Sequence, residues 1–393
     1  MAVKVRNRHK FWNKLVSPIL TRLILKRKFN YTYEKCDIKP PYVVLGNHTT
    51  DYDAFFIAKS FNNPLYFVMS DHISSLKVGK LIEHLVCPIP ITKSTRDVGA
   101  VRGIMEVIRQ GASVALFPEG NKSFAGEMSG MKATIGKLLK KLNVPVVIYN
   151  IEGGYFSSPR WSKQKRKGRL HGFVRKIITP NELQNMSSEE ILGLVKEYGR
   201  VNAYEIQEKN PVKYLGENKA EGIESMLYIC PKCKKMSSLK SKGDEVFCSL
   251  CDFKATYDDY GYLVTENGKL RLDELDKMQK EEIKKIDFLS FGDDEIITSD
   301  EGFDIKKKVD KYTNADVGIF KLNLYKNRFE FVNEKEKISV PFSSVDGYAI
   351  EGQCGIQLSL KDGTVYRFKN PNPVSGLKHV NIYCVITGTE MRF

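Results

Sequence analysis

The sequence predicts an α/β protein with a mostly parallel sheet and flanking helices, followed by a small cysteine ribbon and a C-terminal antiparallel β barrel capped by a helix. Three observations lead to this prediction. Apolar segments of strand length alternate with helical segments between residues 40 and 150, which is typical of parallel sheets. Two Cys-x-x-Cys pairs lie within residues 226–265. Short strand-like segments separated by turns fill residues 293–369, as in small all-β domains.

Each element is predicted from its apolar period and from the turn residues that bound it. In the first half we expect strands at 42–46, 65–69, 112–117 and 144–149, and helices at 99–109 and 131–142. A polar linker is expected at 208–224 and a charged helix at 270–286. In the last part we expect strands at 319–324, 328–332, 338–342, 347–351, 356–360 and 365–368, and a helix over 374–386.

The charge of the chain is concentrated in its first half. Residues 1–215 hold 35 Lys and Arg against 17 Asp and Glu, a balance of +18. The remaining residues hold 27 against 30, a balance of −3, and the two sum to the net charge of +15. A basic half favours a polyanionic partner such as nucleic acid or an anionic membrane surface. A merely solubilising basic surface is the alternative.

The N-terminal segment predicts two short amphipathic helices that meet at Ser17-Pro18. Their basic polar face suits a membrane interface, although a surface helix packed on the domain would show the same period. No apolar run approaches the 18 residues of a spanning helix, and no secretory signal is evident. The apolar stripe consists of Phe11, Trp12, Leu15, Val16, Ile19, Leu20, Leu23 and Ile24.

His48 and Asp53 follow the first predicted strand. Parallel strands place functional sites at their carboxyl ends. A carboxylate five residues after a histidine can hold one imidazole nitrogen and leave the other free as a base. Taken alone the pair is also consistent with a structural histidine.

A second motif, Phe117-Pro-Glu-Gly-Asn-Lys-Ser123, follows the predicted strand over residues 112–117. Its glycine, hydroxyl and lysine offer donors for a phosphate, and an ordinary turn is the alternative. Together, HxxxxD and FPEGxxS after successive strands resemble the glycerolipid acyltransferase family, most closely the 1-acylglycerol-3-phosphate acyltransferases. Residues 90–94 and 144–147 resemble two further blocks of that family. The resemblance covers about residues 5–210.

The resemblance implies a reaction and a role for each matching residue. His48 would be the general base for the acceptor hydroxyl, and Asp53 would orient it. The alkoxide would attack an acyl thioester, from acyl-CoA or acyl-carrier protein, directly. The glycerol phosphate would be held by Lys93, Glu119, Gly120, Lys122 and Ser123.

Three positions depart from the family pattern. Lys93 and Lys122 stand where arginine is usual, so neither can form a bidentate fork with a phosphate. Thr50 stands where serine is usual and keeps the hydroxyl. A basic segment at residues 160–176, with aromatic residues close by, is expected to contact anionic lipid or the phosphates of the donor, or else to be a solvated loop.

Four cysteines form the third motif, with 14 residues between the two pairs. This spacing predicts a zinc ribbon with four thiolate ligands, in which the metal supplies much of the folding energy. Two redox pairs are the alternative. The ligands would be Cys230, Cys233, Cys248 and Cys251, while Cys36, Cys87, Cys354 and Cys384 are expected to be free thiols.

These observations divide the chain into interface helices at 1–29, an acyltransferase domain at 30–215, the zinc ribbon at 226–265 and a pleckstrin-homology-like domain at 290–393. The function predicted is acyl transfer to a lysophospholipid in phospholipid synthesis, by a cytoplasmic protein peripheral on the inner face of the membrane. The alternatives are a zinc-ribbon nucleic-acid-binding protein and a non-catalytic lipid-binding scaffold. Because the ribbon half is net negative, no nucleic-acid partner is expected.

Overall fold

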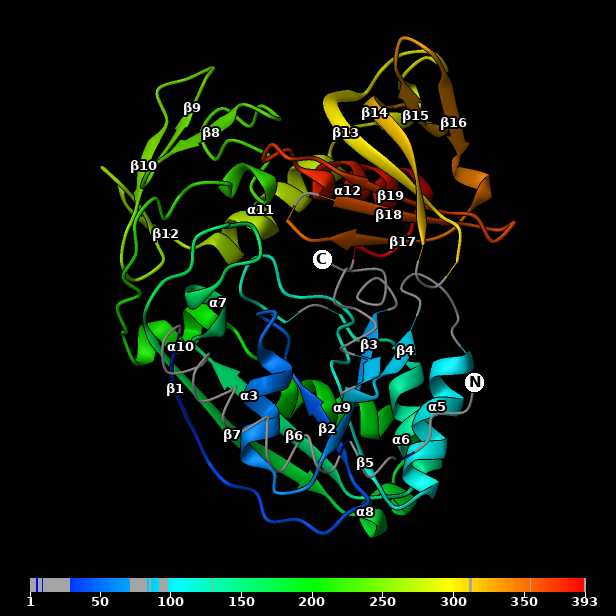
Figure 1. Ribbon diagram of the computed structural model, residues 1–393. Helices are drawn as coiled ribbons and strands as arrows, with labels where there is room; N and C mark the ends of the chain where they lie inside the picture. Colours follow the sequence, from blue (N-terminus) through cyan, green and yellow to red (C-terminus); the bar gives the residue numbers. More distant parts are fainter. Residues whose placement is uncertain are drawn as a thin grey trace. The chain divides into compact units, whose positions relative to one another are not determined.

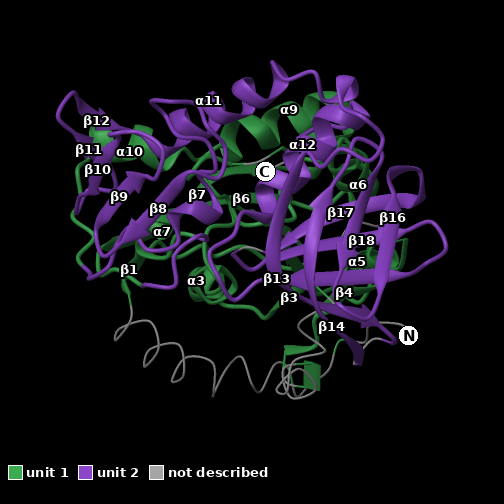
Figure 2. Ribbon diagram, turned by 90° about the horizontal axis from the view of Figure 1, so that it is seen from above, with its two compact units in different colours: residues 1–159, 165–215 green, residues 160–164, 216–393 purple. Residues whose placement is uncertain are grey.

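A computed structural model shows two compact units, residues 1–159 with 165–215 and residues 160–164 with 216–393 (Figures 1 and 2). The described residues are 5, 9, 29–70, 83–84, 86–91, 98–128, 130–310, 313–353 and 355–391. Outside these ranges lie Lys93, Cys354 and, apart from residues 5, 9 and 29, the predicted N-terminal helices. Within the described residues no helix has the length and apolar character needed to span a bilayer.

The first unit contains a seven-stranded sheet in the order β1-β7-β6-β2-β5-β3-β4. Strands β2 to β6 run parallel where they pair, which confirms the parallel-rich α/β prediction. The strands are β1 (Asn30–Tyr33), β2 (Val43–Gly46), β3 (Leu65–Ser70), β4 (Ile89–Ile91), β5 (Ser113–Leu116), β6 (Val146–Glu152) and β7 (Arg169–Ile178).

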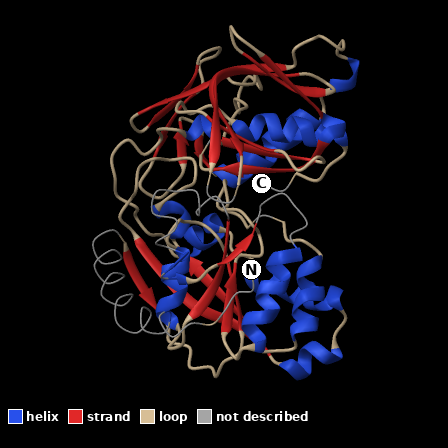
Figure 3. Ribbon diagram, turned by 45° about the vertical axis from the view of Figure 1, so that its right-hand side comes forward, coloured by secondary structure: helices blue, strands red, loops and turns tan. Residues whose placement is uncertain are grey.

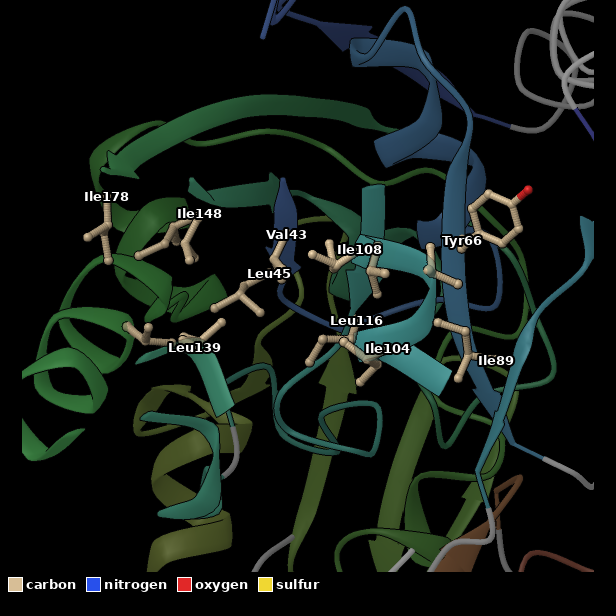
Figure 4. Packing of buried hydrophobic residues seen from close by; sticks show 14 of the residues in the cluster. Val43, Leu45, Tyr66, Ile89, Ile104, Ile108, Leu116, Leu139, Ile148 and Ile178 are labelled. Atoms are coloured by element: carbon tan, nitrogen blue, oxygen red, sulfur yellow. The ribbon is translucent and has the colours of Figure 1, made fainter. Parts of the chain in front are cut away.

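Helices cover both faces of this sheet (Figures 3 and 4). Val43 and Leu45 of β2 face one apolar core, and Val44 faces the other, because successive strand residues point to opposite sides. The first core is closed by α5, α6, α8 and α9, and the second by α3. The helices are α3 (Asp53–Ser60), α5 (Val98–Arg109), α6 (Thr134–Leu142), α7 (Gly154–Ser157), α8 (Pro180–Asn185), α9 (Ser188–Gly199) and α10 (Ala203–Lys209).

Strand β7 was not expected from the sequence. It pairs antiparallel with β6 and parallel with β1, within the segment predicted to be a basic loop. The loop alternative for residues 169–176 is therefore wrong. The strand has Arg169 and Arg175 exposed and Leu170 and Ile178 buried, without a regular alternation between them. This mixture of charged and apolar residues hides the strand when the sequence is viewed alone.

The second unit contains two antiparallel sheets. The cysteine ribbon has the order β12-β11-β10-β9-β8 and is followed by α11 (Leu272–Lys284), close to the charged helix predicted at 270–286. Its strands are β8 (Leu239–Lys242), β9 (Glu245–Cys248), β10 (Lys254–Tyr257), β11 (Leu263–Thr265) and β12 (Gly268–Leu270).

The C-terminal sheet has the order β16-β15-β14-β13-β19-β18-β17 and is capped by α12 (Gly376–Thr387). The predicted closed barrel, pleckstrin-homology-like or otherwise, is not seen, because the end strands β16 and β17 do not pair with each other in the described ranges. Pro341 ends β16 without an N–H to extend a ladder. The strands are β13 (Thr298–Lys308), β14 (Asn314–Leu324), β15 (Arg328–Val332), β16 (Lys337–Pro341), β17 (Val345–Glu351), β18 (Gly355–Leu360) and β19 (Val365–Lys369).

Candidate active site

A short turn of residues 48–53 joins the buried strand β2 to helix α3. Because β2 lies between β5 and β6 in the sheet, this turn stands at the carboxyl ends of the central parallel strands. Asp53 is the first residue of α3 and is completely buried. We call residues 48–53 the His48 turn.

The Asp53 carboxylate organises the His48 turn. Its Oδ2 accepts hydrogen bonds from the backbone N–H groups of Thr49 and Thr50, at 2.6 and 2.9 Å. Its Oδ1 accepts from the Thr50 hydroxyl at 2.6 Å. Such a set of donors compensates the cost of burying a charge and fixes the position of Oδ2. The same oxygen lies 2.8 Å from Nδ1 of His48.

This arrangement fixes the tautomer of His48. An ionised carboxylate can only accept hydrogen bonds, so the imidazole proton belongs on Nδ1 and the lone pair on Nε2. The ring stacks on Phe117, with centroids 4.3 Å apart and planes 15° apart. The side chain keeps 23% of its exposure. In its neutral form His48 therefore presents Nε2 as a base that is oriented on two sides and still accessible to a substrate.

The 117–123 loop, which follows β5, wraps around the backbone of His48. Oε1 of Glu119 accepts from the N–H of His48 at 2.9 Å, and the N–H of Ser123 donates to its carbonyl at 3.0 Å. Gly120 has a φ of +73° in the turn between them, where a side chain would be strained. The hydroxyl of Ser123 is buried and has no hydrogen-bond partner among the described residues.

Lys122 points toward the same turn. Its Nζ lies 2.7 Å from Oδ1 of Asp51, and its side chain is only 18% exposed. The structure therefore brings together His48, Asp53, Glu119, Gly120, Lys122 and Ser123, whereas Lys93 lies outside the described residues.

Two supports of the site were not identified from the sequence. The side-chain amide of Asn47 pairs with both backbone groups of Ile151 on β6, at 3.0 and 2.7 Å. A hydroxyl cluster of Tyr31, Tyr149 and Ser60 ties α3 to β1 and β6. Burial raises the pKa of Tyr149 to about 12 and raises that of Tyr31 as well, so both phenols stay neutral and hydrogen-bonded near neutral pH.

Gly154 gives the first prediction. A Cβ at this position would lie 2.3 Å from Oγ1 of Thr49 and 3.4 Å from Cγ2 of Thr50. Gly154→Ala should therefore displace the His48 turn and destabilise the first unit by about 1–3 kcal/mol, as overpacking does. Gly193→Ala is the control, because nothing lies within 4 Å of its Cβ position. Thermal unfolding that is the same for both variants would contradict this account of the turn.

The four predicted cysteine ligands also come together in the second unit. Their sulfur atoms all lie within 4.8 Å of one another, and two Sγ pairs, Cys230–Cys251 and Cys233–Cys248, are 3.7 and 3.8 Å apart. A tetrahedral zinc with Zn–S bonds of about 2.3 Å places its sulfurs about 3.8 Å apart. None of the four forms a disulfide. The donor set and its spacing therefore fit a zinc ion.

The two Cys-x-x-Cys knuckles form the same backbone hydrogen bond. The N–H of Cys230 donates to Lys235, and the N–H of Cys248 donates to Phe253, five residues ahead in each case. The N–H of Leu250 also points at the sulfur of Cys248, at 3.4 Å. Donors directed at sulfur stabilise a thiolate, the form in which cysteine binds metals.

Part of this chain is similar to known acyltransferases. Residues 26–151 match the family model for acyltransferases. Probable 1-acyl-sn-glycerol-3-phosphate acyltransferases from Mycoplasma genitalium and Mycoplasma pneumoniae are 24% and 22% identical to this chain over 161 residues. Those residues are 39% of this chain and 60% of each relative, so the match spans somewhat more than half the length of these relatives.

Among solved structures, the 1-acyl-sn-glycerophosphate acyltransferase of Thermotoga maritima matches with a TM-score of 0.43 and 20% identity, covering 52% of this chain and 81% of that one. The family match spans the β2 strand, the His48 turn and the 117–123 loop. The part of this chain that resembles acyltransferases is therefore residues 26–151, which match the model of that family.

Proposed function

We propose that this protein transfers a fatty acyl group from an acyl thioester to the free hydroxyl of a lysophospholipid, with 1-acylglycerol-3-phosphate as the acceptor. One observation supports this most strongly. A buried, multiply hydrogen-bonded Asp53 holds Nδ1 of His48 at 2.8 Å inside a domain of the acyltransferase family. The names of the two Mycoplasma relatives support the choice of acceptor.

The proposed chemistry is direct transfer. Nε2 of His48 takes the proton of the acceptor hydroxyl, and the oxygen attacks the thioester carbonyl. The carbon–sulfur bond then breaks, and the leaving thiolate takes the proton back from the imidazolium. Asp53 stabilises the transient imidazolium through Nδ1. Holding both substrates beside one base supplies much of the rate.

The acceptor phosphate is assigned to the 117–123 loop. Lys122 supplies charge, the hydroxyl of Ser123 supplies a donor, and Gly120 keeps the turn open. Glu119 is better placed to support the backbone of His48 than to contact an anion, because two negative groups repel. Lys93 remains a proposed phosphate ligand.

An assay of the purified chain tests the proposal. It would offer a panel of lysophospholipid acceptors with both acyl-CoA and acyl-carrier-protein donors, and would identify the lipid product by mass spectrometry. We expect a diacyl product with 1-acylglycerol-3-phosphate. The absence of product with every combination would contradict the proposal.

We also propose that the protein acts in the cytoplasm at the inner face of an anionic membrane, through the N-terminal apolar stripe. Replacing Trp12, Leu15 and Ile19 together by serine should reduce co-sedimentation with anionic vesicles about tenfold or more, because apolar burial at the interface is lost. The basic residues are retained, so the binding that remains should weaken further as salt rises. Equal vesicle binding by the wild-type chain and the triple serine variant would contradict the membrane role.

Finally, we propose that Cys230, Cys233, Cys248 and Cys251 hold one structural zinc ion. The ion would cross-link the two knuckles and supply no step of the acyl transfer. The spacing of the sulfur atoms supports this proposal.

A further inference from the structure

The basic segment at residues 160–176 contains eight Lys and Arg side chains, and the structure gives them different surroundings. Arg160 donates to the carbonyls of Ile350 and Gly352. Lys163 donates to the carbonyl of Pro371, and Lys176 pairs with Glu182. Arg166 is 1% exposed. These four are engaged within their own units, and Arg169 and Arg175 belong to β7 beside Glu152.

Lys165 is different because it reaches the His48 turn. Its Nζ lies 2.7 Å from the hydroxyl of Tyr52 and 4.3 Å from the centre of the same ring. Tyr52 directly precedes Asp53 and caps α3. Among the basic residues of the segment, Lys165 is thus held one residue from the carboxylate that orients His48.

The backbone beside Lys165 is also anchored to the site. The N–H of Arg166 donates to the carbonyl of Ser157 at 2.9 Å, at the end of helix α7. The first residue of α7, Gly154, abuts the side chain of Thr49. Lys165 is therefore tied to the His48 turn by its side chain and, through α7, by its neighbouring backbone.

No ion pair joins Lys165 to a carboxylate within the described part of the chain, and its hydrogen-bond partner there is the hydroxyl of Tyr52. Lys122, by contrast, pairs with Asp51. Two ammonium groups, those of Lys122 and Lys165, thus contact the adjacent residues Asp51 and Tyr52, of which only Asp51 is acidic.

We propose that Lys165 is a further phosphate ligand beside those named above, and that with Lys122 it selects acceptors with a phosphate monoester over those with a phosphodiester head group. The inference rests on the proposed function and names the head group for the same site. A monoester carries close to two negative charges at neutral pH and presents three oxygens, whereas a diester carries one charge. Lysines act as separate point charges, so the added charge of Lys165 favours the dianion over the monoanion.

The test uses the full chain and four variants. Lys165→Ala removes the ammonium, Lys165→Arg restores a cation, and Tyr52→Phe removes the hydroxyl but keeps the ring. Lys167→Ala is the matched control, because Lys167 is an exposed lysine of the same segment whose backbone pairs with Leu215. Each protein is assayed with 1-acylglycerol-3-phosphate and with 1-acylglycerol-3-phosphocholine.

We expect Lys165→Ala to raise KM for the monoester about tenfold or more with little change in kcat, because a charge-assisted hydrogen bond is lost. The KM for the phosphocholine acceptor should change less than threefold. Lys165→Arg should recover most of the loss, and the KM of Tyr52→Phe for the monoester should lie between those of the wild-type chain and Lys165→Ala. Selectivity is the kcat/KM for the monoester divided by that for the diester. If Lys165→Ala had the same selectivity as Lys167→Ala, the inference would be overturned.

A binding measurement separates this inference from the proposed function. Calorimetric titration with a short-chain 1-acylglycerol-3-phosphate requires no turnover. Tenfold weaker binding by Lys165→Ala, with unchanged binding by Lys167→Ala, would support the phosphate site even if the wild-type chain transferred no acyl group. Equal affinities would overturn the inference even in an active enzyme.

Discussion

Replacing His48 by alanine should lower kcat for acyl transfer by about 10³-fold or more. General bases contribute typically about 10²–10⁴ in rate, and within the described ranges His48 is the imidazole that Asp53 holds. The fold should persist, because the side chain is partly exposed and the Asp53 carboxylate keeps its bonds to Thr49 and Thr50. Steady-state assays and thermal unfolding of the same preparations would measure both effects.

The control for this variant is His171→Ala. His171 is a partly exposed histidine of the same unit, 28% exposed, which bonds to Thr32 on the neighbouring strand. It should keep near-normal turnover. Equal turnover by the His48 and His171 variants would show that His48 is not the base.

Asp53→Asn should lower kcat by about 10²-fold, which is less than the loss expected for His48→Ala. Two backbone N–H groups, those of Thr49 and Thr50, point at Oδ2, so the amide oxygen of asparagine should occupy that place and still accept from Nδ1 of His48. The tautomer is kept, and what is lost is the negative charge that stabilises the imidazolium. A loss as large as that of His48→Ala would contradict this account of the turn.

Removing the proposed zinc should have the largest effect on stability. Chelation, or Cys233→Ser, should release about one zinc per chain and lower the melting temperature of the second unit by about 10 °C or more, because metal binding of this kind is folding free energy. Cys36→Ser is the control, since Cys36 is a buried free thiol of the first unit. Elemental analysis and calorimetry would give the two readouts.

The loss of stability on zinc removal should spread beyond the cysteine ribbon. Ser375 and Asn381 of the α12 region bond to Ser225 and Tyr228, and Lys378 bonds to Ser237. The C-terminal sheet should therefore loosen together with residues 226–265. Protein purified under reducing conditions without any zinc would refute the metal site.

The sequence predicted the central sheet well because its signals are local. Strand β2 and the first four residues of β6 are buried apolar runs, and α5 repeats its apolar residues with a helical period. Strand β7 was missed because polar and charged residues interrupt its apolar ones without a regular two-residue period. The barrel prediction failed because element order does not determine whether the end strands of a sheet pair with each other.

The residues of the site also divide into those that local sequence predicts and those that it does not. His48 and Asp53 are five residues apart, so their contact could be predicted from a turn at a strand end. Asn47, Gly154 and Lys165 act through contacts with residues about 100 positions away in the chain. No local pattern indicates such partners, and only the folded sheet brings them to the His48 turn.

Direct acyl transfer is the central claim, and one stoichiometric measurement tests it. Purified full-length protein would be incubated with acyl-CoA or acyl-carrier protein and 1-acylglycerol-3-phosphate, while free thiol and diacyl product are followed together. The account predicts one diacyl product per thiol released, only when both substrates are present, and no acyl group on the protein by intact mass. Thiol release without acceptor, with an acylated protein, would contradict it.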